Sequence, residues 1–272
     1  MSRPLVTDEF WDFVESELPE LPPPDPRGGR PPVGNRQALT GIMFVLRFGV
    51  PWQALPTELG CGSGSTCWRR LRDWTRTGVW QRIQEKLLQK MADEDVIEAC
   101  MLVIDSASVR ALQGGDHTGP NPTDRGKNGC KRHVITDRDG TPLVAWTTAA
   151  NIRDDMATPE GMLELELLSD QVPALIGDCA LPVILGDRGY GFQWLIDRVR
   201  EHGWLSLLSP RGADKPHGSG LGVARYVVER TLAWFGNYRR IKFCYERTGR
   251  HFQAMHDLAL IDINFQRLAK AS

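Results

Sequence analysis

The stretch "ACMLVIDSASV" (residues 99–109) combines a run of apolar residues with a single carboxylate, Asp105. A short apolar run of this kind predicts a buried β-strand, which we expect to end at Asp105. The stretch "LPVILGDRGYG" (181–191) repeats the pattern, with Asp187 after the apolar run. Ligand sites of open α/β sheets form at the carboxyl ends of strands, so both aspartates are candidates for one site. Either residue taken alone is equally compatible with an ordinary turn or helix cap.

The region around these two runs alternates between strand and helix patterns. Residues 131–150 read as a hairpin, because two strand-like runs flank Asp139-Gly140. Helical spacing over 156–170 and 192–203 predicts two helices, and a further short strand is expected at 204–209. Residues 95–272 are therefore expected to form a mixed α/β sheet with helices on its faces.

A third carboxylate, Glu229, lies within "RYVVERTLAWFGNYRRIKF" (225–243), which reads as an amphipathic helix. Three converging carboxylates repel one another unless a cation lies between them. Oxygen ligands favour Mg²⁺ or Mn²⁺ over zinc. A pair of such ions about 3.5–4 Å apart can activate a water or hydroxyl and stabilise a leaving oxygen on phosphorus. The alternative is a solvent-facing Glu229 paired with Arg225 on the helix surface.

The N-terminal third of the chain has a different character. Residues 1–34 comprise a short helix and a Pro/Gly-rich linker, and residues 35–94 are expected to form four helices. Two of these, 51–60 and 62–78, resemble a helix-turn-helix. In the second, we expect Trp68 and Leu71 to face inward and three arginines to form an outer face that fits a major groove: Arg69, Arg72 and Arg76. A helical bundle with a solvated arginine stripe remains the alternative.

The net charge of −1 hides two basic blocks. Residues 27–90 carry eleven Lys and Arg against three acids, and residues 225–250 carry seven against two. Phosphate neutralisation depends on local charge, so these blocks favour contact with a polyanion, although solvated basic faces are also common.

The chain shows no sign of membrane insertion or of a structural zinc site. No apolar stretch approaches the roughly 20 residues that span a bilayer, and the acidic N-terminus lacks the apolar core of a signal peptide, so we expect a cytoplasmic protein. Six cysteines are scattered without a CxxC pair, which predicts reduced and mostly buried thiols.

Three blocks of the sequence resemble the catalytic blocks of DDE transposases, specifically of the bacterial insertion-sequence-five-like family. They are "LVIDSASVR" (102–110), "ILGDRGYG" (184–191) and "RYVVERTLAWFGNYRRIKFCYER" (225–247). The spacings of 82 residues from the first acid to the second and 42 to the third are compatible with that family. The hairpin region and the N-terminal helical region are similar to the family as well, so the resemblance covers nearly the whole chain.

The resemblance implies an RNase H-like catalytic domain over residues 95–272, preceded by a small all-α helix-turn-helix-like DNA-binding domain over 35–94. Asp105, Asp187 and Glu229 would be the catalytic residues and would hold Mg²⁺, with Mn²⁺ as a substitute. Such an enzyme binds the double-stranded inverted-repeat ends of its element, cleaves the 3′ ends by hydrolysis and joins the 3′ hydroxyls to target DNA. A dimer or larger assembly on nucleoid DNA is expected.

The basic residues follow the family pattern with one departure. Arg225 matches a basic residue four positions before the glutamate, whereas the family's lysine seven positions after it falls on Gly236. The role of that lysine in the family is to position a phosphate near the cut. In this chain the role passes to Asn237, Arg239 or Arg240, or no residue fills it. The expected DNA-binding residues are Arg69, Arg70, Arg72, Arg76, Arg225, Arg230, Arg239 and Arg240.

Two other functions stay open at this point. One is an RNase H-like DNA nuclease that does not transfer strands. The other is a catalytically idle, transposase-derived DNA-binding protein, against which the presence of all three acids argues.

Overall fold

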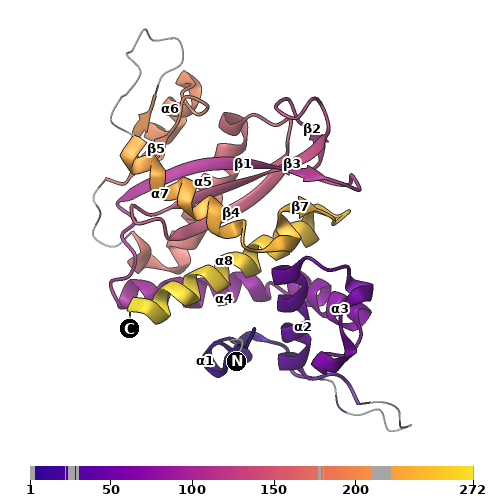
Figure 1. The fold of residues 1–272 in the computed structure, drawn as a ribbon. Helices are drawn as coiled ribbons and strands as arrows, with labels where there is room; N and C mark the ends of the chain where they lie inside the picture. The colour runs from indigo at the N-terminus through magenta and orange to yellow at the C-terminus, as the bar shows by residue number, and fades with distance from the viewer. Residues whose placement is uncertain are drawn as a thin grey trace.

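A computed structural model describes residues 4–21, 23, 28, 31–176, 179, 181–209 and 222–271, with only the backbone described for 222–225. Its centre is a mixed sheet in the spatial order β4-β3-β1-β5-β6 (Figure 1). The strands are β1 (Met101–Ala111), β3 (Asn128–Thr136), β4 (Pro142–Ala149), β5 (Val183–Gly186) and β6 (Leu205–Leu208). Strands β1, β3 and β4 form an antiparallel meander, and β5 and β6 continue it in parallel with β1. This is the predicted RNase H-like arrangement.

Two short strands extend the long central ones. Strand β2 (Gly119–Pro120) pairs with the start of β3, and β7 (Phe243–Cys244) pairs in parallel with the end of β1. The hairpin between β3 and β4 turns around Asp139-Gly140, as predicted.

Helices cover both faces of the sheet. Helix α7 (Gly222–Phe235) crosses one face, where Val228 packs against Val103 and Leu185 (Figure 1). Helix α5 (Asp154–Gln171) covers the other face, and α6 (Gln193–Glu201) leads from β5 into β6. Helix α8 (Gly249–Ala271) runs beneath the sheet. No helix in the described ranges is long and apolar enough to cross a membrane.

The N-terminal helices share one hydrophobic core with the sheet and α8. They are α1 (Asp8–Val14), α2 (Asn35–Phe48), α3 (Gly64–Arg76) and α4 (Val79–Asp93). Helix α4 lies alongside α8 (Figure 1). An ion pair joins Arg47 on α2 to Asp262 on α8, and Asp262 also accepts a hydrogen bond from Tyr238 at 2.6 Å. The division into domains at residues 34 and 94 stays a prediction.

The expected helix over 51–60 is wrong. Two separate 3₁₀ turns, Trp52–Ala54 and Thr57–Leu59, occupy it. Leu55 adopts an extended conformation before Pro56, because a proline disfavours helical geometry in the residue that precedes it. The first half of the expected helix-turn-helix is thus not an α-helix. The second half is α3, which lies within the expected range 62–78, and Ser63 caps it by accepting a hydrogen bond from the backbone N–H of Thr66.

Two element boundaries also differ from the expectation. Strand β1 does not end at Asp105 but continues to Ala111, because β3 pairs with it as far as Arg110. Helix α7 ends at Phe235 and a 3₁₀ turn follows at Arg239–Ile241. Gly236 therefore lies after the helix and not on the helical face that carries Glu229.

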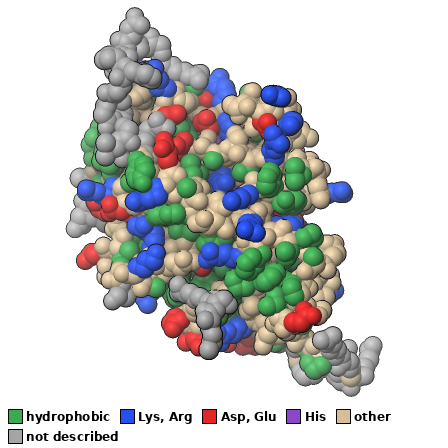
Figure 2. Space-filling model, viewed as in Figure 1, with side chains coloured by type: hydrophobic (Ala, Val, Ile, Leu, Met, Phe, Trp, Pro, Cys, Tyr) green, Lys and Arg blue, Asp and Glu red, His purple; other side chains and the backbone are tan. Residues whose placement is uncertain are grey.

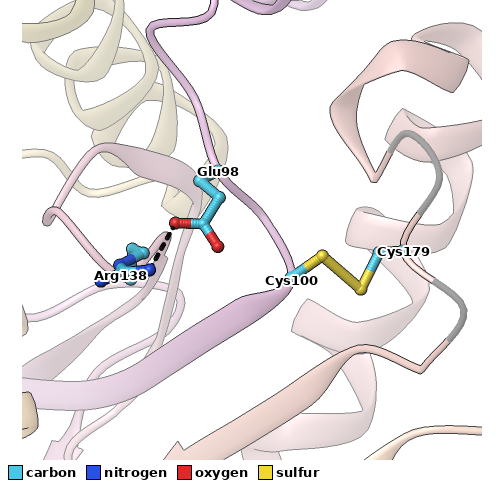
Figure 3. The surroundings of a disulfide bond; sticks show 4 residues. All are labelled: Glu98, Cys100, Arg138 and Cys179. Carbon is cyan, nitrogen blue, oxygen red and sulfur yellow. Dashed lines mark ion pairs between the residues drawn. A yellow bond between two sulfur atoms is a disulfide. The ribbon is translucent and has the colours of Figure 1, made fainter.

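The prediction that all cysteines are reduced is wrong for one pair. Cys100 and Cys179 form a disulfide next to the ion pair of Glu98 and Arg138 (Figure 3). The bond joins the residue just before β1 to the segment that leads into β5. The other four cysteines are buried free thiols: Cys61, Cys67, Cys130 and Cys244.

The contact between α5 and β4 gives a test of the packing. A Cβ atom on Gly161 would lie 2.2 Å from Cη2 of Trp146, whose ring is buried and whose Nε1 donates to the carbonyl of Ala157. We expect Gly161→Ala to lower the free energy of unfolding by about 1–3 kcal/mol in urea titrations. Glu160→Ala, at an exposed position of the same helix, is the control. Equal stability of the two variants would contradict this packing.

Candidate active site

The pairing of β1 with β5 brings the first two predicted acids together. The parallel register matches Met101 with Val183 and Val103 with Leu185. Continued by two residues, it places Asp105 beside Asp187, which directly follows β5. Neighbouring strands lie about 4.8 Å apart, and residues two apart share a face. The two half-buried carboxylates therefore leave adjacent strands on the same face of the sheet.

Helix α7 lies over this same face. Val228 packs against Val103 and Leu185, the residues two positions before the two aspartates. Glu229, the next residue of the helix, has an exposed side chain. Within the described part of the chain, no three His, Cys, Asp or Glu side chains form a group that could hold a metal ion. The fold thus pairs Asp105 with Asp187 and places the helix that carries Glu229 on their face, without a preformed three-residue group.

Backbone N–H groups orient both aspartates. Oδ1 of Asp105 accepts a hydrogen bond from the backbone N–H of Ser106 at 2.8 Å, and Oδ1 of Asp187 accepts one from the backbone N–H of Gly189 at 2.6 Å. Both bonds are local, since donor and acceptor lie one and two residues apart in the chain.

Asp154 is a further acid at this site that the sequence analysis missed. It lies in the first turn of α5 and accepts hydrogen bonds from Oγ of Ser106 at 2.7 Å and Nζ of Lys131 at 3.1 Å. A Cβ atom on Gly189 would lie 2.7 Å from Oδ1 of Asp187 and 3.5 Å from Oδ2 of Asp154. Both carboxylates therefore border one small space. In the sequence Asp154 only precedes a helix, and nothing there relates it to β1.

Tyr190 shows how closely these acids are grouped. Its side chain is buried, and burial raises the pKa of its hydroxyl well above the ordinary value, with further contributions from the negative charges of Asp154, Asp105 and Asp187. The hydroxyl therefore remains protonated at neutral pH and can donate a hydrogen bond toward these carboxylates.

Several of the arginines predicted to bind DNA contact groups of the protein itself. Arg70 donates to Oδ1 of Asn35 and the carbonyl of Val33, both at 3.3 Å. Arg230 donates to the carbonyl of Asp139 at 2.7 Å.

Three other predicted arginines lie on or after α7. Arg240 is buried, and its Nη2 lies 2.6 Å from Oε1 of Glu246. Arg239 is exposed. The side chain of Arg225 lies outside the described residues.

The remaining arginines lie on α3. Arg69 is exposed, and its Nε donates to the carbonyl of Ser65 in its own helix. Arg72 and Arg76 line a groove of about 1550 Å³ between α3 and the start of α8. Trp68, expected to face inward, is only half buried and also lines this groove, with its ring 5.2 Å from that of His251. Further residues of the groove are Gln113, His117, Arg240, Tyr245, Arg247 and Arg250.

The groove carries concentrated positive charge. Burial lowers the pKa of His251, Glu246 opposes this shift, and the charges of Arg72, Arg76 and Arg250 lower the pKa further. Among the described residues, Arg76 and Arg250 form no ion pair, whereas Arg72 pairs with Asp73 at 2.8 Å. Figure 2 shows further Lys and Arg side chains across the viewed face of the molecule. A groove with this charge favours an anionic ligand.

Solved structures that resemble this chain include transposases of low sequence identity. The catalytic domain of Mos1 mariner transposase aligns with 75% of this chain and 94% of its own length at 11% identity and a TM-score of 0.32. A Mos1 mariner paired-end complex with Mn aligns with 91% of this chain and 82% of its own length at 12% identity and a TM-score of 0.30.

Two curated relatives come from Burkholderia cepacia. The "Insertion element IS402 uncharacterized 16.2 kDa protein" is 51% identical over 45% of this chain and 84% of its own length. The "Putative transposase for insertion sequence element IS402" is 40% identical over 49% of this chain, and the match spans 62% of that relative's length.

Family models match both parts of the chain. Residues 6–84 match the family described as "Putative transposase of IS4/5 family". Residues 98–261, which include β1, β5, α7 and all four acids described above, match the family described as "Transposase DDE domain". The chain belongs to the DDE transposases of bacterial insertion sequences.

Proposed function

We propose that this transposase binds the ends of its insertion sequence, hydrolyses the 3′ ends and joins the freed 3′ hydroxyls to target DNA, with Asp105, Asp187 and Glu229 as its catalytic acids. The parallel register that sets Asp105 beside Asp187, beneath the helix that carries Glu229, is the observation that carries this proposal. The family match supports the reaction class.

The donor set fits hard divalent cations. Carboxylate oxygens are the ligands that Mg²⁺ prefers, and Mn²⁺ accepts the same set. Bound at these acids, a pair of such ions would activate the attacking oxygen and stabilise the leaving one. Asp105 and Asp187 are already oriented by backbone N–H groups, and Glu229 would complete the ligand set from α7. Water and then the 3′ hydroxyl act as nucleophiles, so no covalent bond forms between the protein and DNA.

The basic groove is the surface that we propose for the DNA backbone. It combines residues of α3 with residues around the start of α8, and the loop after β1 borders it. Ala111 lies six positions after Asp105 on β1, a span of about 20 Å. At about 3.4 Å per base pair, phosphates held in the groove would lie roughly six base pairs from the cleavage site.

The proposed reaction at two element ends also predicts that several copies of the protein assemble on DNA. Two element ends must be cut and joined in concert, so we infer that a dimer or larger complex forms on DNA. Its chromosomal substrate places the protein at the nucleoid.

Asp187→Asn tests the proposed chemistry. The substitution keeps the size of the side chain but removes the charge, so we expect nicking of a labelled terminal-repeat duplex in Mg²⁺ to fall about a thousandfold or more while binding to that duplex persists. Asp170→Asn, an exposed acid near the end of α5, is the control. Unchanged nicking would remove Asp187 from the site. Wild-type nicking without joined products would favour a nuclease, and binding alone would favour an idle DNA-binding protein.

Salt dependence tests the groove. We expect the double variant Arg76→Gln/Arg250→Gln to bind the same duplex more weakly, with the slope of log affinity against log salt concentration reduced by about 0.9 for each phosphate that the variant no longer neutralises. The double variant Arg198→Gln/Arg200→Gln is the matched control, because both side chains are exposed on α6. A slope equal to that of the wild type would argue against phosphate binding in the groove.

His251 reports on the same groove by titration. Because Arg72, Arg76 and Arg250 lower its pKa, phosphates that neutralise them should raise this pKa when DNA binds. The protonated imidazole should then persist to higher pH in an NMR titration of the complex than in the free protein. His202, which contacts Glu166, is the internal control. No change at His251 would mean that DNA binds elsewhere.

A further inference from the structure

Asp154 has a structural link to each of the two strand acids. Ser106 connects it to the first: the backbone N–H of Ser106 donates to Asp105 at 2.8 Å, and its hydroxyl donates to Asp154 at 2.7 Å. Gly189 links it to the second: a Cβ atom on Gly189 would lie 2.7 Å from Oδ1 of Asp187 and 3.5 Å from Oδ2 of Asp154. A shift of Asp154 would therefore disturb the surroundings of both acids.

Lys131 holds Asp154 in this position. Its Nζ lies 3.1 Å from Oδ1 of Asp154 and also donates to the carbonyl of Ile152 at 2.8 Å. The side chains of Lys131 and Asp154 are only 15% and 26% exposed. Solvent therefore screens this ion pair less than it would screen a surface pair. The pair offsets part of the repulsion that three neighbouring carboxylates exert on one another.

Tyr190 supplies a second observation at the same place. Its side chain is buried near Ser106, yet its hydroxyl completes no hydrogen bond of normal geometry with any residue in the described ranges. Buried polar groups normally have a partner, so this hydroxyl can bond to a further polar species that enters the space next to Ser106.

A purely structural role for Asp154 would be to stabilise the N-terminus of α5. Its neighbour Asp155 already supplies a negative charge there, and that residue is fully buried, bonded to Arg153 and to Nε1 of Trp194. Asp154 instead bonds to the sheet, to Ser106 on β1 and to Lys131 on β3, next to the strand that carries Asp105.

We propose that Asp154 is a fourth acid of the active site, which Lys131 and Ser106 hold as a positioning residue beside Asp105 and Asp187. In this role it would keep the two strand acids in their ligating orientation and would accept a hydrogen bond from water when a divalent ion is bound. This inference rests on the proposed function, because it assumes that Asp105 and Asp187 hold the ion.

Titration of the metal-free protein with Mn²⁺ in a calorimeter tests the proposal without relying on activity. Loss of a residue that orients metal ligands usually costs about 10–100-fold in affinity. We therefore expect Asp154→Asn to weaken Mn²⁺ binding by about that factor and to shift the Mg²⁺ midpoint of nicking in the same direction. Binding to the terminal-repeat duplex in EDTA should stay at the wild-type level. Asp155→Asn, which removes a charge from the same helix end, should leave Mn²⁺ affinity unchanged once its folding is verified.

Two further variants keep the test decisive if Asp154→Asn does not fold. Ser106→Ala removes only the bridging hydroxyl and should weaken Mn²⁺ binding severalfold. Lys131→Met should weaken it as well, and combining Lys131→Met with Asp154→Asn should add little, because residues that act as one unit are not additive.

The outcomes separate the inference from the proposed function. Wild-type Mn²⁺ affinity in Asp154→Asn, together with weakened binding in Asp187→Asn, would overturn the role of Asp154 alone. Wild-type affinity in both variants would overturn the proposed metal site itself.

Discussion

The parallel pairing of β1 with β5 is the constraint on which the whole site depends. Side chains alternate along a strand, so a slip of one residue would turn either aspartate to the opposite face. The small apolar group of Val103, Leu185 and Val228 opposes such a slip, because it packs α7 onto the face that also carries Asp105 and Asp187. The same contact thus fixes the register and places the helix that brings Glu229.

Grouping acids near the central strand of a sheet costs stability, and the structure shows what offsets this cost. Backbone N–H groups bond to Asp105 and Asp187, and Lys131 pairs with Asp154. The first two contacts are local and the third joins α5 to β3, so the carboxylates keep one arrangement. A cation that binds among these carboxylates reduces their mutual repulsion. The electrostatics of the site therefore favour the metal-dependent chemistry that we propose.

The arginine side chains fall into two groups, those that bond within the protein and those that border the groove. Arg70, Arg230 and Arg240 bond to acceptors within the protein and join segments that are distant in sequence. Arg76 and Arg250 form no ion pair among the described residues and border the groove where α3 meets α8. Because the helical region and the sheet share one hydrophobic core, this groove has walls from both. The length of β1 therefore sets the distance between the groove that we propose for DNA and the proposed catalytic acids.

Local patterns in the sequence were sufficient to predict the strand before Asp187 and the hairpin at Asp139-Gly140, because neighbouring residues determine both of them. The resemblance to known transposases identified the RNase H-like fold. Only the tertiary structure extended β1 past Asp105, through its pairing with β3, and brought Asp154 beside Ser106, 48 residues earlier in the chain. Contacts between such distant residues leave no periodic signal in a sequence, since they depend on how strands and helices pack in space.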